Sequence, residues 1–247
     1  MATLAFTPLT GGRSAKAPVL LVHGFASTPY HNWVSTGWVK TLEAAGYPLH
    51  LVTLPYHRLQ SVEDESLRPA TLLDISWADP QDAVAQLSEV LKTYTEGLGQ
   101  PAHLIGFSIG ARVLWGFAAT FPHLALTLTL GAMPVNSRLD QVHSSLLGEI
   151  DVPEGFDSVL ACSPIAPESL VSFTSAHFPA VDPEIIPRCP VFMYEGCKDS
   201  LAHSRSAFNL LSTRQANWLE IAGRDHINIL TSGQVRKETV RFLDEHR

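Results

Sequence analysis

The sequence has few cysteines, no excess of basic residues and no long apolar run. Its 247 residues include three cysteines, and no two of them form a Cys-x-x-Cys pair. An odd count without such a pair does not indicate a disulfide framework, and free cysteine is most often a packing residue. We therefore expect free thiols, no metal and no cofactor.

Charge and hydropathy exclude further classes. With 17 Lys and Arg against 24 Asp and Glu, the formal charge is −7, and no basic stripe is available to neutralise phosphates. The apolar run at residues 17–22 is too short for a signal peptide or a membrane span. We expect a cytoplasmic protein that binds a small molecule and neither nucleic acid nor membrane. The oligomeric state stays open.

Short apolar segments alternate with amphipathic ones along most of the chain. Strand candidates end at loops or turn residues, and helix candidates repeat apolar residues on one face. This alternation predicts an α/β fold with a mostly parallel central sheet flanked by helices. The expected strands are 19–22, 49–54, 103–107, 126–130, 191–194 and 218–221. Helices are expected at about 33–45, from Pro80 to about 97 with Asp79 as the N-cap, after Ser108, and at 232–243.

Residues 133–188 interrupt the alternation. They contain 7 of the 17 prolines and indicate short helices around 137–147 and 168–177. A long insertion after the strand at 126–130 is typical of a helical lid, so we expect a core of 1–132 and 189–247 and a lid of 133–188. Eight acidic and two basic side chains give this segment a charge of −6. Such charge fits either a solvated surface or a lid that disfavours polyanionic substrates.

The most informative motif is Gly106-Phe107-Ser108-Ile109-Gly110. It lies where an apolar strand candidate gives way to a helical segment, which is the context of a nucleophile elbow. The sharp turn strains the serine backbone and points Oγ outward, and a side chain at either glycine would collide with the neighbouring chain.

A serine nucleophile needs a histidine to accept its proton and a carboxylate to orient that histidine. Asp199 follows the strand candidate at 191–194, and His226 follows the one at 218–221. Glu195 is the weaker substitute for the acid. Asp225 is adjacent to His226 and is expected to point elsewhere.

The loops that carry Ser108, Asp199 and His226, together with His23-Gly24-Phe25, follow one another in the order typical of the α/β-hydrolase superfamily. The chain resembles a lidded, esterase-like serine hydrolase of that superfamily. The resemblance covers about residues 17–132 and 189–246. It implies a catalytic triad of Ser108, Asp199 and His226. It also implies an oxyanion hole made by the backbone N–H groups of Phe25 and Ile109.

Other expectations concern the pocket and the loops around it. Phe25, Tyr56 and Arg112 are candidate pocket residues, and His23 is expected to hold its loop by hydrogen bonds rather than act as a second base. Tyr56 departs from the family pattern Leu-Pro-Gly-His-Gly, because the chain reads Leu-Pro-Tyr-His-Arg at 54–58. The segment before Val19 is short for the antiparallel strands that usually open this fold. A sheet of fewer than eight strands is therefore compatible with the sequence.

Three functions are compatible with these residues. The favoured one is a carboxylesterase that cleaves a small or medium neutral ester through an acyl-enzyme. The elbow through Arg112 is also similar to that of menaquinone-pathway lyases and carbon–carbon bond hydrolases. In that interpretation Arg112 binds a carboxylate, whereas an arginine one helical turn past the nucleophile more often makes a structural ion pair. A non-catalytic binding protein of the same fold is the third, and it is less favoured because no triad member is missing.

Overall fold

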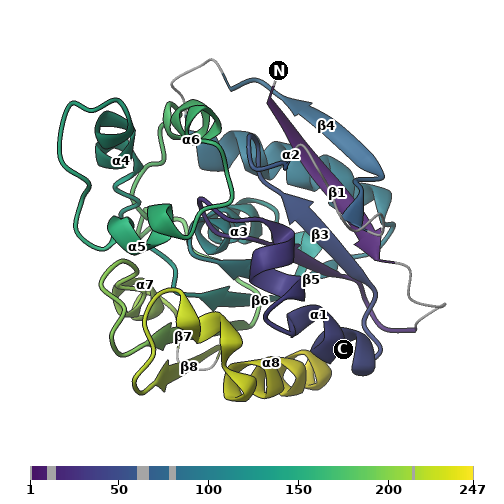
Figure 1. Ribbon diagram of the computed structural model, residues 1–247. Coiled ribbons are helices and arrows are strands. Elements are labelled where there is room, and N and C mark those ends of the chain that lie inside the picture. Colours follow the sequence, from purple (N-terminus) through teal and green to yellow (C-terminus); the bar gives the residue numbers. More distant parts are fainter. Residues whose placement is uncertain (1, 10–14, 60–66, 78–81, 213–214, 247) are drawn as a thin grey trace.

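The computed structural model describes residues 2–9, 15–59, 67–77, 82–212 and 215–246. Within them, eight strands form one sheet in the order β4-β1-β3-β2-β5-β6-β7-β8 (Figure 1). All neighbouring strands from β3 to β8 pair in parallel, so their carboxyl ends lie at one edge. The strands are β1 (Ala2–Leu9), β2 (Val19–Val22), β3 (Leu49–Thr53), β4 (Thr71–Ile75), β5 (Ala102–Phe107), β6 (Ala125–Gly131), β7 (Val191–Gly196) and β8 (Ala216–Ile221).

The outer strands β1 and β4 were not expected from the sequence. β1 pairs antiparallel with both β3 and β4, so that the short N-terminal segment forms the second strand of the sheet and the 71–75 segment forms its edge. The sheet therefore has its full eight strands. Edge strand β4 alternates between partly exposed and exposed side chains up to its last residue, which is why its apolar signal is weak.

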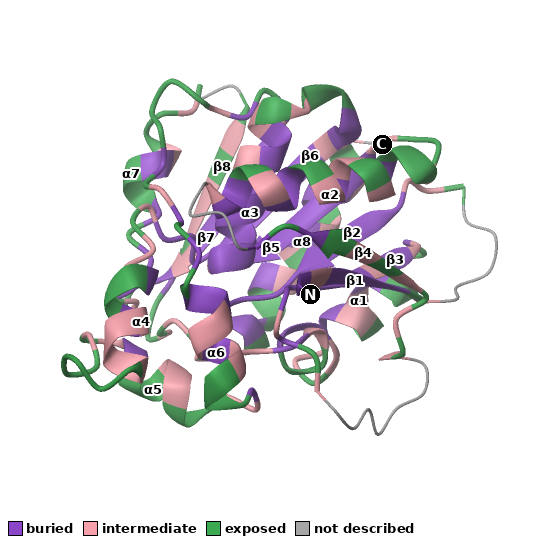
Figure 2. Cartoon of the chain, turned by 90° about the horizontal axis from the view of Figure 1, so that it is seen from above, coloured by how far each residue is buried: buried purple, intermediate pink, exposed green. Residues whose placement is uncertain are grey.

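Helices cover both faces of the sheet, and the strand side chains alternate between the two cores. On one face, Leu20 and Val22 pack with helices α2 (Ala83–Gly97) and α3 (Ile109–Thr120). On the other, Val19 and Leu21 pack with α1 (Trp38–Ala44) and α8 (Gly233–Glu245). Buried residues accordingly concentrate in the central strands and on the helix faces turned toward them (Figure 2).

Two helix boundaries differ from the prediction. The segment expected as one helix at 33–45 is split into a π-helical turn η1 (Tyr30–Val34) and α1, because Gly37 takes a left-handed φ of +83°. Helix α2 begins at Ala83 with Asp82 as its cap, and Asp82 Oδ1 accepts from the N–H of Val84 at 2.8 Å. The predicted cap at Asp79 and Pro80 lies outside the described residues.

The insertion (residues 133–188) leaves the sheet after β6 and returns at β7. It contains α4 (Leu139–Leu146), α5 (Phe156–Ala161) and α6 (Pro167–Thr174), of which only α5 was not predicted. Figure 1 shows these helices grouped beside the sheet, next to α7 (Arg205–Phe208). Two short 3-10 turns, η3 (Pro122–Leu124) and η4 (Asn228–Thr231), complete the described elements. In the part of the chain described, no helix has the length and apolar character needed to span a membrane.

Candidate active site

Ser108 lies on a strained turn between β5 and α3. Its φ of +52° is in a region that side chains other than glycine rarely adopt. A Cβ at Gly106 would lie 2.6 Å from Ala111 Cα, and one at Gly110 would collide with the carbonyl oxygens of Val22 and His23. The glycines therefore allow the α3 backbone to lie directly against β2 and β5, and this close packing fixes the turn that presents Ser108.

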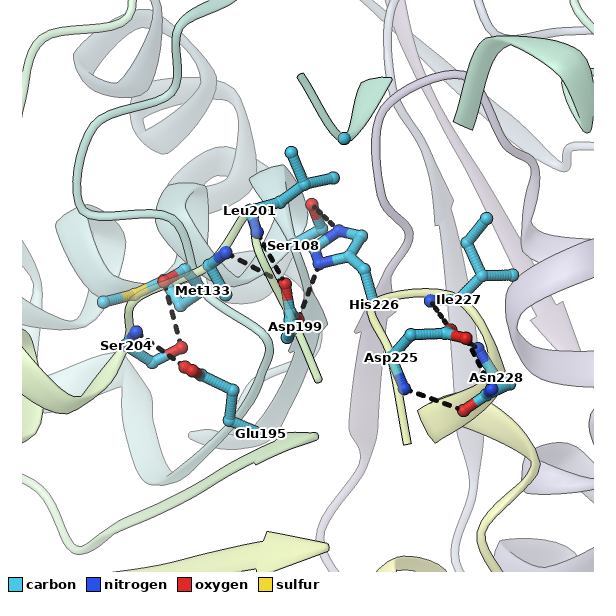
Figure 3. A network of polar contacts seen from close by, with 12 residues as sticks. Ser108, Met133, Glu195, Asp199, Leu201, Ser204, Asp225, His226, Ile227 and Asn228 are labelled. Carbon is cyan, nitrogen blue, oxygen red and sulfur yellow. Dashed lines mark hydrogen bonds and ion pairs between the residues drawn. The ribbon is translucent and has the colours of Figure 1, made fainter. Parts of the chain in front are cut away.

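Ser108, His226 and Asp199 form a continuous hydrogen-bonded chain, although 118 residues separate the serine from the histidine (Figure 3). His226 Nε2 lies 2.9 Å from Ser108 Oγ, and His226 Nδ1 lies 2.8 Å from Asp199 Oδ2. The Asp199 side chain is fully buried, and that of His226 is 11% exposed. A carboxylate at Nδ1 keeps that proton in place and leaves Nε2 free to accept the serine proton.

Asp199 is held as a carboxylate. Burial would raise its pKa, but the hydrogen bond and charge attraction from His226 act against this, as do the N–H groups of Leu201 and Ala202. Those N–H groups donate to Oδ1 at 2.8 and 3.1 Å, and the net effect is a pKa below the ordinary value. The acid thus stays ionised and stabilises a positive charge on His226.

The loops that carry the acid and the histidine are joined through their backbones. Cys197 N–H donates to Ile221 O at 3.0 Å, and Lys198 N–H donates to Arg224 O at 2.9 Å. A Cβ at Gly196 would collide with Arg224 O, so this contact requires glycine. The distance between Asp199 and His226 is therefore set by backbone packing.

The two competing acids have other partners. Glu195 Oε2 accepts from the N–H of Ser204 at 2.7 Å, while Ser204 Oγ donates to Met133 O at 3.0 Å (Figure 3). Burial raises the pKa of Glu195. Asp225 accepts from the N–H groups of Ile227 and Asn228 within its own turn. Neither acid contacts the His226 ring through a described hydrogen bond.

Two backbone N–H groups next to Ser108 are free to bind an oxyanion. Within the described residues, the N–H groups of Phe25 and Ile109 donate to no acceptor. Ile109 begins α3, where the first N–H groups of a helix have no intrahelical partner. Phe25 follows Gly24, and a Cβ at Gly24 would lie 3.2 Å from Ser108 Cβ, so the two loops are in close contact.

A cavity of about 360 Å³ opens on Ser108 and His226. Phe25 and Ile109 line it, and the insertion contributes part of its wall. Of the described residues that line it, none is Lys, Arg, Asp or Glu. The lining residues away from the triad are Gly24, Phe25, Ala26, Ser27, His31, Asn32, Thr36, Phe107, Ile109, Pro134, Ser137, Leu139, Phe156, Val159, Cys162, Leu201, Ile227, Asn228, Leu230 and Thr231.

Two of the three predicted pocket residues do not line this cavity. Arg112 is 5% exposed and donates through one guanidinium nitrogen to Pro179 O at 3.0 Å and Ala180 O at 2.8 Å. Tyr56 packs on the ring of Trp77 and takes a φ of +61°, at the position where the family pattern has glycine. The expectation that either contacts substrate is therefore not supported, and only Phe25 lies at the cavity.

Sequence reasoning missed His57 and Asn32. Both are buried, and each accepts a hydrogen bond from the loop that contains Phe25. The signal for His57 was its place in the Leu-Pro-x-His pattern at residues 54–57, whereas Asn32 belongs to no motif. No group of three or more His, Cys, Asp or Glu among the described side chains is arranged to hold a metal ion.

The sheet order, the serine turn and the hydrogen-bonded chain to His226 and Asp199 define an enzyme of the hydrolase class. A family model described as "Alpha/beta hydrolase family" matches residues 19–230. The chain therefore belongs to the alpha/beta hydrolase family.

Solved structures agree in fold at low identity. A thermophilic esterase from Thermogutta terrifontis is 16% identical, with a TM-score of 0.69 over 100% of this chain and 95% of that one. A carboxylesterase structure from Nitrososphaera gargenis is 14% identical, with a TM-score of 0.70 over 99% and 95% of the two chains. A monoacylglycerol lipase from Paleococcus ferrophilus is 18% identical, with a TM-score of 0.62 over 100% of both. No curated protein is detectably similar in sequence.

Proposed function

We propose that the protein is a serine esterase that cleaves a small or medium neutral carboxylic ester. The observation that carries this proposal is the unbroken chain from Ser108 Oγ through His226 to Asp199, beside a cavity whose described lining has no Lys, Arg, Asp or Glu. Esterase and lipase structures share this fold.

The mechanism follows from the positions of the donors and acceptors. Ser108 Oγ attacks the ester carbonyl carbon while His226 Nε2 accepts its proton, and Asp199 stabilises the resulting imidazolium. The carbonyl oxygen becomes an oxyanion that accepts from the N–H groups of Phe25 and Ile109. His226 then donates the proton to the departing alcohol, which leaves an acyl-Ser108. Water attacks this acyl-enzyme with His226 again as base, and the acid is released.

The lining of the cavity supports a neutral substrate of limited size. A bound carboxylate or phosphate would lack a cationic partner there, since Arg112 is engaged by the carbonyls of Pro179 and Ala180. Burying an unpaired charge is costly. For the same reason, elimination or carbon–carbon cleavage of a carboxylate substrate is disfavoured relative to ester hydrolysis.

The insertion fits the role of a lid. Six of its residues line the cavity opposite the core loops: Pro134, Ser137, Leu139, Phe156, Val159 and Cys162. Most of these side chains are apolar, which suits an acyl chain and supports a role of the insertion in selecting acyl length.

Burst kinetics test the proposal directly. With p-nitrophenyl esters from acetate to decanoate, we expect a p-nitrophenol burst stoichiometric with enzyme, and covalent labelling of Ser108 by a fluorophosphonate. Ser108→Ala is the blank, and Ser137→Ala, which removes another cavity hydroxyl, is the matched control and should keep the burst. Absence of both the burst and the label in the wild-type protein would refute the esterase assignment.

A further inference from the structure

Two buried histidines, His23 and His57, join the loop that contains Phe25 to the turn after β3. His23 directly follows β2, and His57 lies in the turn after β3. Both side chains are fully buried. His23 Nε2 accepts from the N–H of Leu54 at 3.0 Å, and His57 Nε2 accepts from the N–H of Ala26 at 3.1 Å. Each ring thus binds the backbone of the loop that carries the other.

The partners of the two rings fix their protonation. A backbone N–H can only donate, so both Nε2 atoms must be unprotonated acceptors. The proton of each ring therefore lies on Nδ1, where His23 donates to Gly24 O and His57 donates to Pro55 O, both at 2.7 Å. Burial lowers the pKa of both rings, to about 4 for His57, which keeps them neutral in ordinary buffers.

The hydrogen bonds select which N–H of the loop stays free. Gly24 N–H donates to Asn32 Oδ1 at 2.7 Å, and Ala26 N–H donates to His57 Nε2. The N–H of Phe25, between them, donates to no acceptor in the described chain. The backbone on either side of Phe25 is therefore held by a buried polar side chain, and the remaining N–H is left for a ligand at Ser108.

The loop needs this support, because its backbone conformation is unfavourable. Ala26 takes a φ of +56°, which costs a residue other than glycine about 1 kcal/mol or more. The Phe25 ring contacts His57, at 5.9 Å between ring centroids, and Phe173 of the insertion, at 5.8 Å, and those two rings lie 4.6 Å from each other. His57 therefore contacts both the backbone that follows Phe25 and the side chain of Phe25.

We propose that His57, supported by His23, is a positioning residue of the oxyanion hole, which directs the Phe25 N–H toward the carbonyl attacked by Ser108. This proposal rests on the esterase function proposed above. His57 touches neither substrate nor the reacting atoms. It acts through Ala26 and Phe25, so its loss should weaken stabilisation of the oxyanion more than binding of the ester.

A pair of variants separates positioning from stability. Gln at position 57 can keep an acceptor near the place of Nε2, and Asn can keep a donor near the place of Nδ1. We expect His57→Gln to lose less than about 5-fold in kcat and His57→Asn to lose about 10- to 100-fold, with KM changed less than about 3-fold. The matched control is His103→Gln, since His103 is also buried but lies at the opposite end of β5 from Ser108 and pairs with Thr127.

An oxyanion analogue provides the second readout. A trifluoromethyl ketone forms a hemiketal oxyanion on serine, and its inhibition constant should rise in His57→Asn by the same factor by which kcat falls. The methyl ketone of the same chain, which stays largely unreacted, should bind both proteins alike. The rate of fluorophosphonate labelling at Ser108 should fall in parallel, and this measurement needs no knowledge of the natural substrate.

The outcomes are distinct. Equal kcat losses in both His57 variants, proportional to their melting temperatures and matched by His103→Gln, would overturn the positioning role. Unchanged kcat and unchanged ketone inhibition in His57→Asn would overturn it as well. In either case a wild-type protein that is labelled at Ser108 leaves the esterase function standing, whereas an unlabelled and inactive wild-type protein refutes both proposals.

Discussion

The carboxyl edge of the sheet and the insertion form opposite walls of one cavity, but they are held in place by different interactions. At the sheet edge, backbone packs on backbone, as at Gly106, Gly110 and Gly196, where a Cβ would collide with neighbouring main chain. The insertion is tied to the core largely by side chains that donate to its carbonyls: Arg112 to Pro179 and Ala180, Trp115 Nε1 to Ile185 O, and Trp77 Nε1 to Ser172 O. Two backbone hydrogen bonds add to these, from Ala83 N–H to His177 O at 2.9 Å and from Val135 N–H to Ala202 O at 3.4 Å.

This difference assigns different tasks to the two regions. Backbone contacts tolerate little displacement, which suits the placement of Ser108, His226 and Asp199 within hydrogen-bond distance. Side-chain ties can be exchanged without disturbing the sheet, which suits a wall that determines substrate size. The insertion also carries −6 of the chain's formal charge of −7, so the two regions differ in net charge as well.

Ser108→Ala should have the largest effect, and that effect should be confined to catalysis at the carboxyl edge of the sheet. We expect kcat to fall by about 10⁵-fold or more, because the variant has no nucleophile, while the melting temperature changes little because Ala keeps the Cβ and the backbone contacts of the turn. Single-turnover kinetics and differential scanning calorimetry check this. Residual burst activity above the buffer rate would show that another residue is the nucleophile.

Asp199→Asn should have the next largest effect. The amide is close in size to the carboxylate but cannot stabilise the imidazolium, and it favours the wrong tautomer of His226, so kcat should fall by about 10⁴-fold. Asp225→Asn is the matched control, since that carboxylate binds its own turn, and it should keep kcat within about 3-fold. Similar losses in the two variants would contradict the assignment of the acid.

Acid should destabilise the sheet core through its buried histidines. Burial lowers the pKa of His57 and His103 from 6.5 to about 4, so between these values the unfolded state binds more protons than the folded state. Stability is therefore complete above pH 6.5 and is lost as the pH falls toward 4, by about 3 kcal/mol for His57 alone.

Urea unfolding at several pH values from 7 to 4.5 measures this slope. The His103→Gln variant removes one of the titrating groups and should show a shallower loss of stability with falling pH. An identical slope in the variant would mean that His103 does not contribute to the acid sensitivity.

Arg112→Met should loosen the insertion and leave the triad intact. The two carbonyls of Pro179 and Ala180 would lose their donor, which should cost about 2 kcal/mol of stability and expose the insertion to protease. Arg112→Lys keeps one donor and should be intermediate. Limited proteolysis with mass spectrometry locates the cleavage, and new cuts outside 133–188 would contradict the role of Arg112 in fixing this segment.

Val159→Phe should give the smallest effect, confined to substrate preference. Val159 lines the cavity, and the larger ring should lower kcat/KM for long acyl chains by about 10-fold while acetate is cleaved as before. Leu160→Phe is the matched control, because Leu160 adjoins Val159 but is not among the described residues that line the cavity. An equal loss on acetate would show that the insertion also affects the triad.

The central strands and the serine turn could be predicted from the amino-acid sequence. These follow from local rules: an apolar run buried on both faces reads as a strand, and two glycines around a serine permit a sharp turn into a helix. The order of the loops along the chain then allowed Asp199 and His226 to be predicted. That prediction needed no knowledge of distances, since parallel strands bring their carboxyl ends to one edge.

Features that depend on contacts between residues far apart in the chain could not be predicted in this way. Arg112 has the same sequence context whether it faces a cavity or, as here, two carbonyls 67 and 68 residues away. Strand β4 is half exposed and has only a weak apolar pattern, so its pairing with β1 shows that it is a strand. The hydrogen bonds from Leu54 N–H to His23 and from Ala26 N–H to His57 each join residues 31 positions apart. Such pairings are chosen by packing of the whole chain, because each buried donor or acceptor must find a partner that folding brings near.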